Sequence, residues 1–165
     1  MRRSDRYRFW IVLAGLVLLH FSVRTRLGGD RVAPDFLLLA LLLYTTRAAP
    51  GPGAAAGFLV GLVRDTLAPA SFGAAALAHT LVGYLSSWAK AVFFAENLFV
   101  NGCIFFGGTW LRNLVVVLAS GELKGTPLVW ELLVWSPLQS LTTAVVGVLV
   151  LWSLGRWVAV RMSDA

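Results

Sequence analysis

Apolar residues form long blocks along the chain, separated by short polar or glycine- and proline-rich stretches. The blocks cover approximately residues 9–23, 32–46, 51–63, 66–89, 97–119 and 128–154. A helix that crosses a bilayer needs about 20 mainly apolar residues. The pattern therefore predicts an all-α integral membrane protein: a single multi-pass domain over residues 1–165, folded as a compact bundle of about six transmembrane helices.

Two of these blocks, 32–46 and 51–63, are short for spanning a hydrocarbon core of about 30 Å. They can be short tilted helices, or one can be partly re-entrant, which a membrane protein tolerates only inside a bundle. Five crossing helices are therefore the alternative to six.

The composition agrees with a membrane protein. Hydrophobic residues make up 58% of the chain and charged residues 13%, about half the usual ~25% of a globular domain. This excludes an ordinary soluble globule, a disordered chain and a fibrous repeat. The stretches between blocks are short, so they leave no room for a soluble catalytic domain.

The net charge of +6 raises the question of nucleic acid, but the basic residues lie between apolar blocks instead of on one face. We therefore predict no nucleic-acid partner. Four arginines fall within residues 1–8, which we interpret as a short cytoplasmic tail beside anionic membrane lipid. Arg24, Thr25 and Arg26 follow the first block where a signal peptide would have a small-residue cleavage site, so we expect an uncleaved helix.

With six helices, the side of the N-terminus collects eight basic residues and the other side five. This modest bias favours a cytoplasmic N-terminus. The eight are Arg2, Arg3, Arg6, Arg8, Arg47, Lys90, Arg156 and Arg161, and the five are Arg24, Arg26, Arg31, Arg64 and Lys124.

Motifs for catalysis or cofactor binding are missing. The sequence has no phosphate-binding loop, no GxSxG and no HExxH. The single Cys103 provides no disulfide, and two isolated histidines are a weak basis for a metal site. We therefore expect no cofactor, no metal and no enzymatic activity.

Gly53, Gly57 and Gly61 recur every four residues, which places them on one face of a helix. Such a face lets another backbone approach closely. We favour packing within the bundle, and a docking face for a partner is the alternative.

A few charged residues are candidates for a polar pocket or a partner contact. Asp35 follows Pro34 at the start of the second block, where we favour an N-terminal helix cap. For Arg64 and Asp65 we favour a headgroup contact and a cap on the fourth helix, respectively. Contact of each of these residues with a partner is the alternative.

Arg112 lies within the fifth block, where an unpaired guanidinium is costly. We expect it to face the interior or an acidic group, with Asp35, Asp65 and Glu131 as candidates, or to extend from a helix end to the membrane surface. Pro137, inside the last block, predicts a kink because it cannot donate a backbone hydrogen bond.

Residues 34–85 resemble the MreD family of rod shape-determining proteins. The matching stretches are PDF at 34–36, a turn rich in proline and glycine after Arg47, GFLVGLVRD at 57–65, FG at 72–73 and LAHTLVGYL at 77–85. Ala75 stands where a histidine is common in the family, and His79 where an aromatic residue is common.

The resemblance implies a multi-pass protein of the bacterial cytoplasmic (inner) membrane. It would be a scaffold of the cell-wall elongation machinery (the elongasome) that helps set and maintain rod shape. It would bind the single-pass protein MreC and so link MreB filaments to the glycosyltransferase–transpeptidase pair of peptidoglycan synthesis. The family is also similar in fold to the substrate-binding S components of energy-coupling-factor transporters. The alternative function is therefore the substrate-binding subunit of a vitamin-type transporter.

Overall fold

A computed structural model describes residues 3–23, 31–92 and 97–158, which contain helices and no strand. Helix α1 (Arg3–Val23) is followed by the short α2 (Phe36–Thr45), which is almost entirely buried. Asp35 caps α2, because its backbone is not helical and its side chain accepts a hydrogen bond from the Leu38 amide. The predicted block 32–46 is thus too long at its start.

Helix α3 (Pro50–Leu67) has prolines in its first turn, where no amide donor is needed. The chain then makes the one-turn 3₁₀ helix η1 (Pro69–Ser71) and enters α4 (Ala74–Val92) through Gly73, whose φ is 97°. The expected helix 66–89 is therefore wrong at its start, because Pro69 cannot continue a helix and Gly73 has a left-handed conformation.

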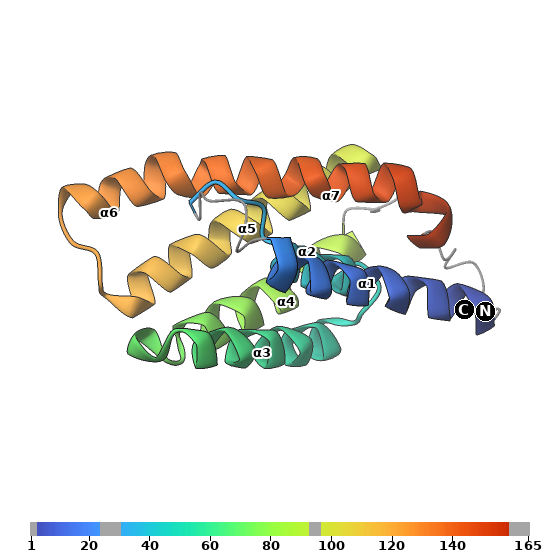
Figure 1. The fold of residues 1–165 in the computed structure, drawn as a ribbon, viewed down its shortest axis with the longest axis horizontal. Helices are drawn as coiled ribbons and strands as arrows, with labels where there is room; N and C mark the ends of the chain where they lie inside the picture. The colour runs from blue at the N-terminus through green and yellow to red at the C-terminus, as the bar shows by residue number, and fades with distance from the viewer. Residues whose placement is uncertain (1–2, 24–30, 93–96, 159–165) are drawn as a thin grey trace.

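Helix α5 (Leu98–Ser120) is capped by Asn97 and ends at Gly121, which has a φ of 63°. Then α6 (Thr126–Trp130), the π-helical turn η2 (Glu131–Trp135) and α7 (Ser136–Val158) follow without a break. These three elements form one long rod along the upper edge of Figure 1, and α3 lies along the opposite edge.

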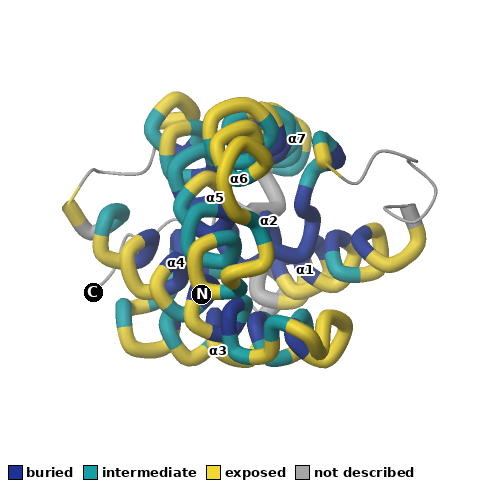
Figure 2. The backbone as a smooth tube through the Cα atoms, turned by 90° about the vertical axis from the view of Figure 1, so that its left-hand side faces the viewer, coloured by how far each residue is buried: buried dark blue, intermediate teal, exposed yellow. Residues whose placement is uncertain are grey.

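The short helix α2 lies at the centre of the bundle. It contacts α1, α3, α4, α5 and α7, while the most extensive pairings are α3 with α4 and α5 with α7. Figure 2 shows buried backbone in the interior and exposed turns on the outer helices. The leucines of α2, such as Leu38, Leu39 and Leu42, are fully buried, so α2 is the core around which the longer helices pack.

In the described part of the chain, two helical segments are long and apolar enough to cross a membrane: Leu98–Ser120 and Thr126–Leu154. Tyr7–Ser22 and Phe36–Thr45 are shorter apolar helices. The tail expected over residues 1–8 is helical from Arg3 onward, and its cytoplasmic position stays a prediction. Large apolar side chains such as Leu18, Phe58 and Leu149 are exposed on the outside of the bundle.

Candidate functional site

Asp35 is the centre of a buried polar cluster. Its side chain is fully buried, and Oδ1 accepts a hydrogen bond of 3.1 Å from the Leu38 amide. Its own amide donates to Thr143 Oγ1 of α7 at 3.1 Å. The residue therefore caps α2 and also attaches the start of α2 to α7.

Two arginines from other helices pair with the same carboxylate. Arg64 Nη1, from the last turn of α3, and Arg112 Nη2, from α5, both donate to Asp35 Oδ2. The exposed fractions of the two arginine side chains are 17% and 10%. Asp35 is thus the acidic group that Arg112 faces, and the interpretation of Arg64 as a headgroup contact is wrong, because its guanidinium turns inward.

His20, near the end of α1, completes what we call the Asp35 cluster: His20, Asp35, Arg64, Arg112 and Thr143. His20 Nδ1 accepts a hydrogen bond of 3.3 Å from the Leu37 amide and lies 3.6 Å from Asp35 Oδ1. The cluster therefore joins α1, α2, α3, α5 and α7.

A second set of hydrogen bonds extends the cluster along the segment before α2. Asn113 Nδ2 donates to Gln139 Oε1 at 2.9 Å, and Gln139 Nε2 donates to the Ala33 carbonyl at 3.2 Å. Thr142 Oγ1 donates to the Val32 carbonyl at 2.7 Å. These bonds satisfy backbone carbonyls of a non-helical stretch, one on buried Ala33 and one on half-buried Val32; leaving them unpaired in an apolar interior would be costly.

Nothing in the sequence pattern connected His20, Asn113, Gln139 or Thr143 with Asp35. Each is an isolated polar residue in an apolar block. Only Arg112 could be predicted to have a partner, because an unpaired charge in an apolar helix is costly. The one available signal was that isolated polar residues on apolar helices usually hydrogen-bond between helices.

Asp65 occupies a different site from Arg64, although the two are adjacent. Asp65 is buried, with 1% of the residue exposed. Its carboxylate accepts hydrogen bonds from the amides of Ala75 at 3.0 Å and Ala76 at 2.9 Å. It thus satisfies the first amides of α4 from the end of α3. Thr66 Oγ1 instead donates to the Val63 carbonyl of its own helix.

The face formed by Gly53, Gly57 and Gly61 is buried against α4. A Cβ atom on Gly57 would lie 2.0 Å from the His79 carbonyl oxygen, and one on Gly61 would lie 2.4 Å from the Cα of Ala76. On α4, a Cβ on Gly83 would meet the Gly53 carbonyl oxygen at 2.2 Å. We call this contact the glycine seam; it leaves no space for a partner.

The two prolines have different local roles. Pro34 lies one residue before the Asp35 cap and therefore outside the first turn of α2, where proline is common. Upstream of Pro137 the backbone forms the π-helical turn η2, and the Ser136 amide bonds to the Glu131 carbonyl five residues earlier. Pro137 has no backbone N–H to donate, and the helix widens locally just before it while α6, η2 and α7 remain continuous.

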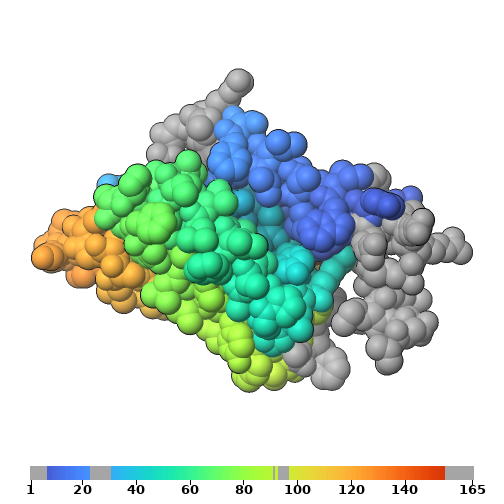
Figure 3. Space-filling model, turned by 90° about the horizontal axis from the view of Figure 1, so that it is seen from below, coloured from blue at the N-terminus to red at the C-terminus, as the bar shows by residue number. Residues whose placement is uncertain are grey.

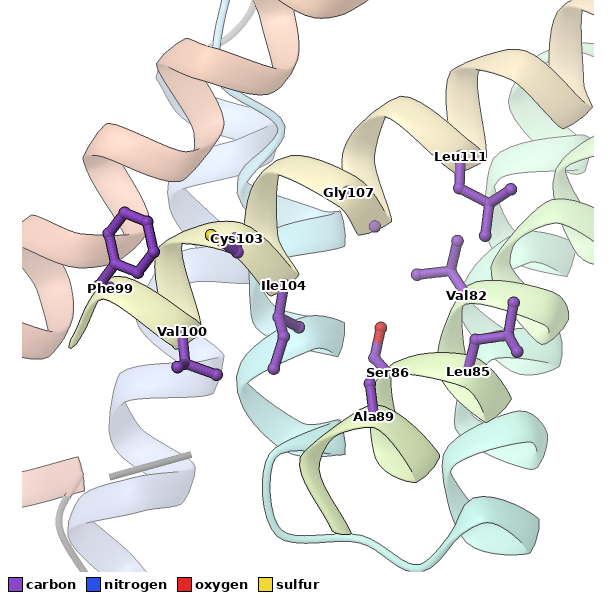
Figure 4. A pocket seen from close by; sticks show the side chains of 11 residues that line it. Val82, Leu85, Ser86, Ala89, Phe99, Val100, Cys103, Ile104, Gly107 and Leu111 are labelled. Atoms are coloured by element: carbon purple, nitrogen blue, oxygen red, sulfur yellow. The ribbon is translucent and has the colours of Figure 1, made fainter. Parts of the chain in front are cut away.

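An apolar groove remains open between α4 and α5. It has a volume of about 420 Å³, and Figure 4 shows Val82 and Ser86 of α4 on one side and Ile104 and Leu111 of α5 on the other. Small residues contribute to its lining: Ser86, Ala89, Cys103, Gly107 and Gly108. We call it the α4/α5 groove.

The chemistry available at these sites is limited. The Asp35 carboxylate is engaged by two arginines and by backbone, and no group of three His, Cys, Asp or Glu residues in the described part of the chain could hold a metal ion. The arrangement is that of a helical membrane protein with internal ion pairs. It can hold helices at fixed positions.

A family model described as rod shape-determining protein MreD matches residues 1–155 of the 165-residue chain. The chain therefore belongs to the MreD family of membrane proteins and has a role in determining rod cell shape. Members of this family are structural components that determine cell shape, and the family is not a known enzyme family. No curated protein and no solved structure matches the chain, so the likeness to S components stays a prediction.

Proposed function

We propose that the protein is a non-enzymatic scaffold of the cell-wall elongation machinery. In this proposal it binds the membrane helix of a single-pass MreC-like protein. Through that partner it links MreB-like filaments to the glycosyltransferase–transpeptidase pair that synthesises peptidoglycan. Membership of the MreD family supports the role in shape, and the open α4/α5 groove is the observation that supports binding of a partner helix.

The groove is suited to a helix because part of its wall carries no bulky side chains. Cys103 and Gly107 lie four residues apart on α5, and a Cβ on Gly107 would meet no atom within 4 Å. In lipid, helix association depends on close packing of small residues because the hydrophobic effect offers little between apolar surfaces. A partner helix with its own small residues could approach α5 closely at this position.

The proposed setting is the bacterial inner membrane, with a cytoplasmic N-terminus and all helices of the bundle crossing. Consecutive helices are then antiparallel, and the Asp35 cluster lies toward the outer side, because it collects the ends of α1 and α3 and the start of α2. The partner would enter the α4/α5 groove from the lipid.

The test is co-purification of the MreC-like protein from membranes with Gly107→Leu, measured together with cell shape. Filling the groove should reduce capture of the partner at least about tenfold, which corresponds to about 1.4 kcal/mol, and should give rounded cells. Gly15→Leu is the matched control, because Gly15 is exposed on α1, has no atom within 4 Å of a Cβ and lies outside the groove.

Two results would count against the proposal in different ways. Full capture by the Gly107→Leu protein would exclude the α4/α5 groove as the docking site. Failure of the unchanged protein to capture any MreC-like partner would exclude the scaffold itself. In a transport subunit, Arg112 and Asp35 would be candidates for holding a ligand. They pair with each other, so no observation favours that second function.

A further inference from the structure

A second groove, of about 640 Å³, runs along the outside of the bundle between α1, α2 and α3. Its walls are apolar and include Leu13, Val17, Leu41 and Val60. Figure 3 shows this side of the molecule, with α1 in blue beside α3 in green. At one end the rings of Trp10 and Tyr44 lie 6.3 Å apart, so the groove is narrowed there by two amphipathic aromatic side chains.

Arg47 lies just beyond this aromatic end, in the turn between α2 and α3. Its guanidinium carbon is 4.0 Å from the centre of the Phe9 ring, and its Nη1 is buried and has no hydrogen-bond partner. Burial lowers the pKa of Arg47 below its usual range, and the guanidinium remains charged even so. A charged donor that is desolvated on one side and has no acceptor is costly.

A second cation lies at the same end of the bundle. Lys90 is in the last turn of α4, and Ser87, one turn earlier, meets Gly53 in the first turn of α3, directly after the turn that carries Arg47. The acidic residues whose side chains are described lie elsewhere: Asp35 and Asp65 at the opposite ends of α2 and α3, and Glu122 and Glu131 between α5 and α7. This end of the groove therefore has positive charge without a described carboxylate to balance it.

We propose that the groove between α1, α2 and α3 binds an anionic phospholipid, with one acyl chain along the apolar walls and the phosphate at Arg47 and Lys90. The charge and the apolar walls together select this ligand. Arginine binds phosphate oxygens with two parallel hydrogen bonds, and tryptophan and tyrosine are typical of the headgroup level of a bilayer.

A phospholipid fits better than a partner helix at this site. The walls hold Ala14, Ala40 and Ala56, but large side chains between them, such as Trp10, Leu18 and Tyr44, keep a second helix backbone at a distance. A single flexible acyl chain can follow such a surface. The bound lipid would supply an acceptor for the accessible part of the half-buried Arg47 guanidinium and would fill the space between three helices. This inference does not depend on the α4/α5 groove or on the proposed partner.

Trp10 provides a direct probe, because bromine on an acyl chain quenches tryptophan at contact. The full-length protein is placed in nanodiscs of phosphatidylcholine, and brominated phosphatidylglycerol is titrated in, with brominated phosphatidylcholine as the comparison. The Trp10 signal, defined as the part lost in Trp10→Phe, should be quenched at a lower mole fraction of phosphatidylglycerol than of phosphatidylcholine.

The charge variants test the headgroup contact. Arg47→Gln and Lys90→Gln should each raise the half-quenching mole fraction of phosphatidylglycerol about fivefold, as expected for a basic residue near an anionic lipid surface. Arg47→Lys should retain most of the preference. Lys124→Gln, the same change at an exposed residue between α5 and α6, should leave the preference unchanged.

The acyl-chain contact has its own pair of variants. Ala14→Leu narrows the groove from an exposed position and should weaken quenching, whereas Gly15→Leu, one residue further and outside the groove, should not. Equal quenching by both brominated lipids, or no effect of Arg47→Gln combined with Lys90→Gln, would overturn the proposal. Competition by inorganic phosphate at millimolar concentration would also overturn it, because a bare anion would then suffice.

Discussion

Small residues line two parts of this molecule: the glycine seam, which is closed by a neighbouring helix, and the α4/α5 groove, which is open. In the glycine seam, Gly53 and Gly57 of α3 press against the backbone of α4, and the place of a Cβ is already occupied. In the α4/α5 groove, the place of a Cβ on Gly107 is empty. Spacing of small residues thus predicts that a helix surface can be approached closely, but it does not identify the approaching element.

The difference follows from how the two helix pairs meet. Gly53 and Gly83 face each other across the seam. The backbone of each one occupies the space that a side chain on the other would need. At the α4/α5 groove, two adjacent glycines of α5 differ. A Cβ on Gly108 would lie 2.8 Å from a Leu42 methyl group of α2, whereas a Cβ on Gly107 would have no atom within 4 Å. The closed interior ends and the open groove begins between two consecutive residues.

The largest expected effect is at Asp35, which holds the closed interior together at one end. Asp35→Asn keeps a helix cap but removes the charge that Arg64 and Arg112 share, which should lower the free energy of unfolding by about 3–5 kcal/mol. Unfolding in detergent measures this. Adding Arg64→Gln should recover part of the loss; no recovery would mean that the ion pairs are not its cause.

The glycine seam gives the next effect. Gly57→Ala should destabilise the bundle by about 1–3 kcal/mol, because a methyl group would overlap the His79 carbonyl and α3 must move away from α4. Gly51→Ala, in the same helix with no atom near its Cβ, should be neutral or stabilising, since alanine favours helix. Equal thermal stability of the two variants would disprove close packing at the seam.

A smaller loss is expected at the joint between α3 and α4. Asp65→Ala removes the acceptor for the Ala75 and Ala76 amides and should cost about 1–2 kcal/mol in the same unfolding assay. Thr66→Ala is the control, because its exposed hydroxyl bonds only within α3. Similar losses for both would show that the Asp65 cap contributes little.

The smallest effect should come from the open groove. Gly107→Leu should change the stability of the isolated protein by no more than about 0.5 kcal/mol, since its side chain enters empty space. Gly108→Leu, one residue further, should destabilise clearly because Leu42 is in the way. If both variants were equally unstable, the contrast between seam and groove would be lost.

Features that are local to one helix could be predicted from the sequence. The Asp35 cap of α2 follows from capping chemistry, and the shared face of Gly53, Gly57 and Gly61 follows from helical period. The predicted blocks around α2 and α4 both began too early, and for α4 the reason is that an uninterrupted apolar composition concealed the turn at Pro69 and Gly73. The membrane-surface prediction for Arg64 was wrong because its partner is a carboxylate 29 residues away in the sequence.

By itself, then, the sequence determined that the chain is a helical membrane protein, because its composition and block lengths leave few other ways to satisfy the backbone. It also determined the MreD family. Only the tertiary structure decided which charges pair and which small residues are covered. Those outcomes depend on contacts between distant segments, such as Asp35 with Arg112 across 77 residues, and helical period carries no information about the neighbour that a face will meet.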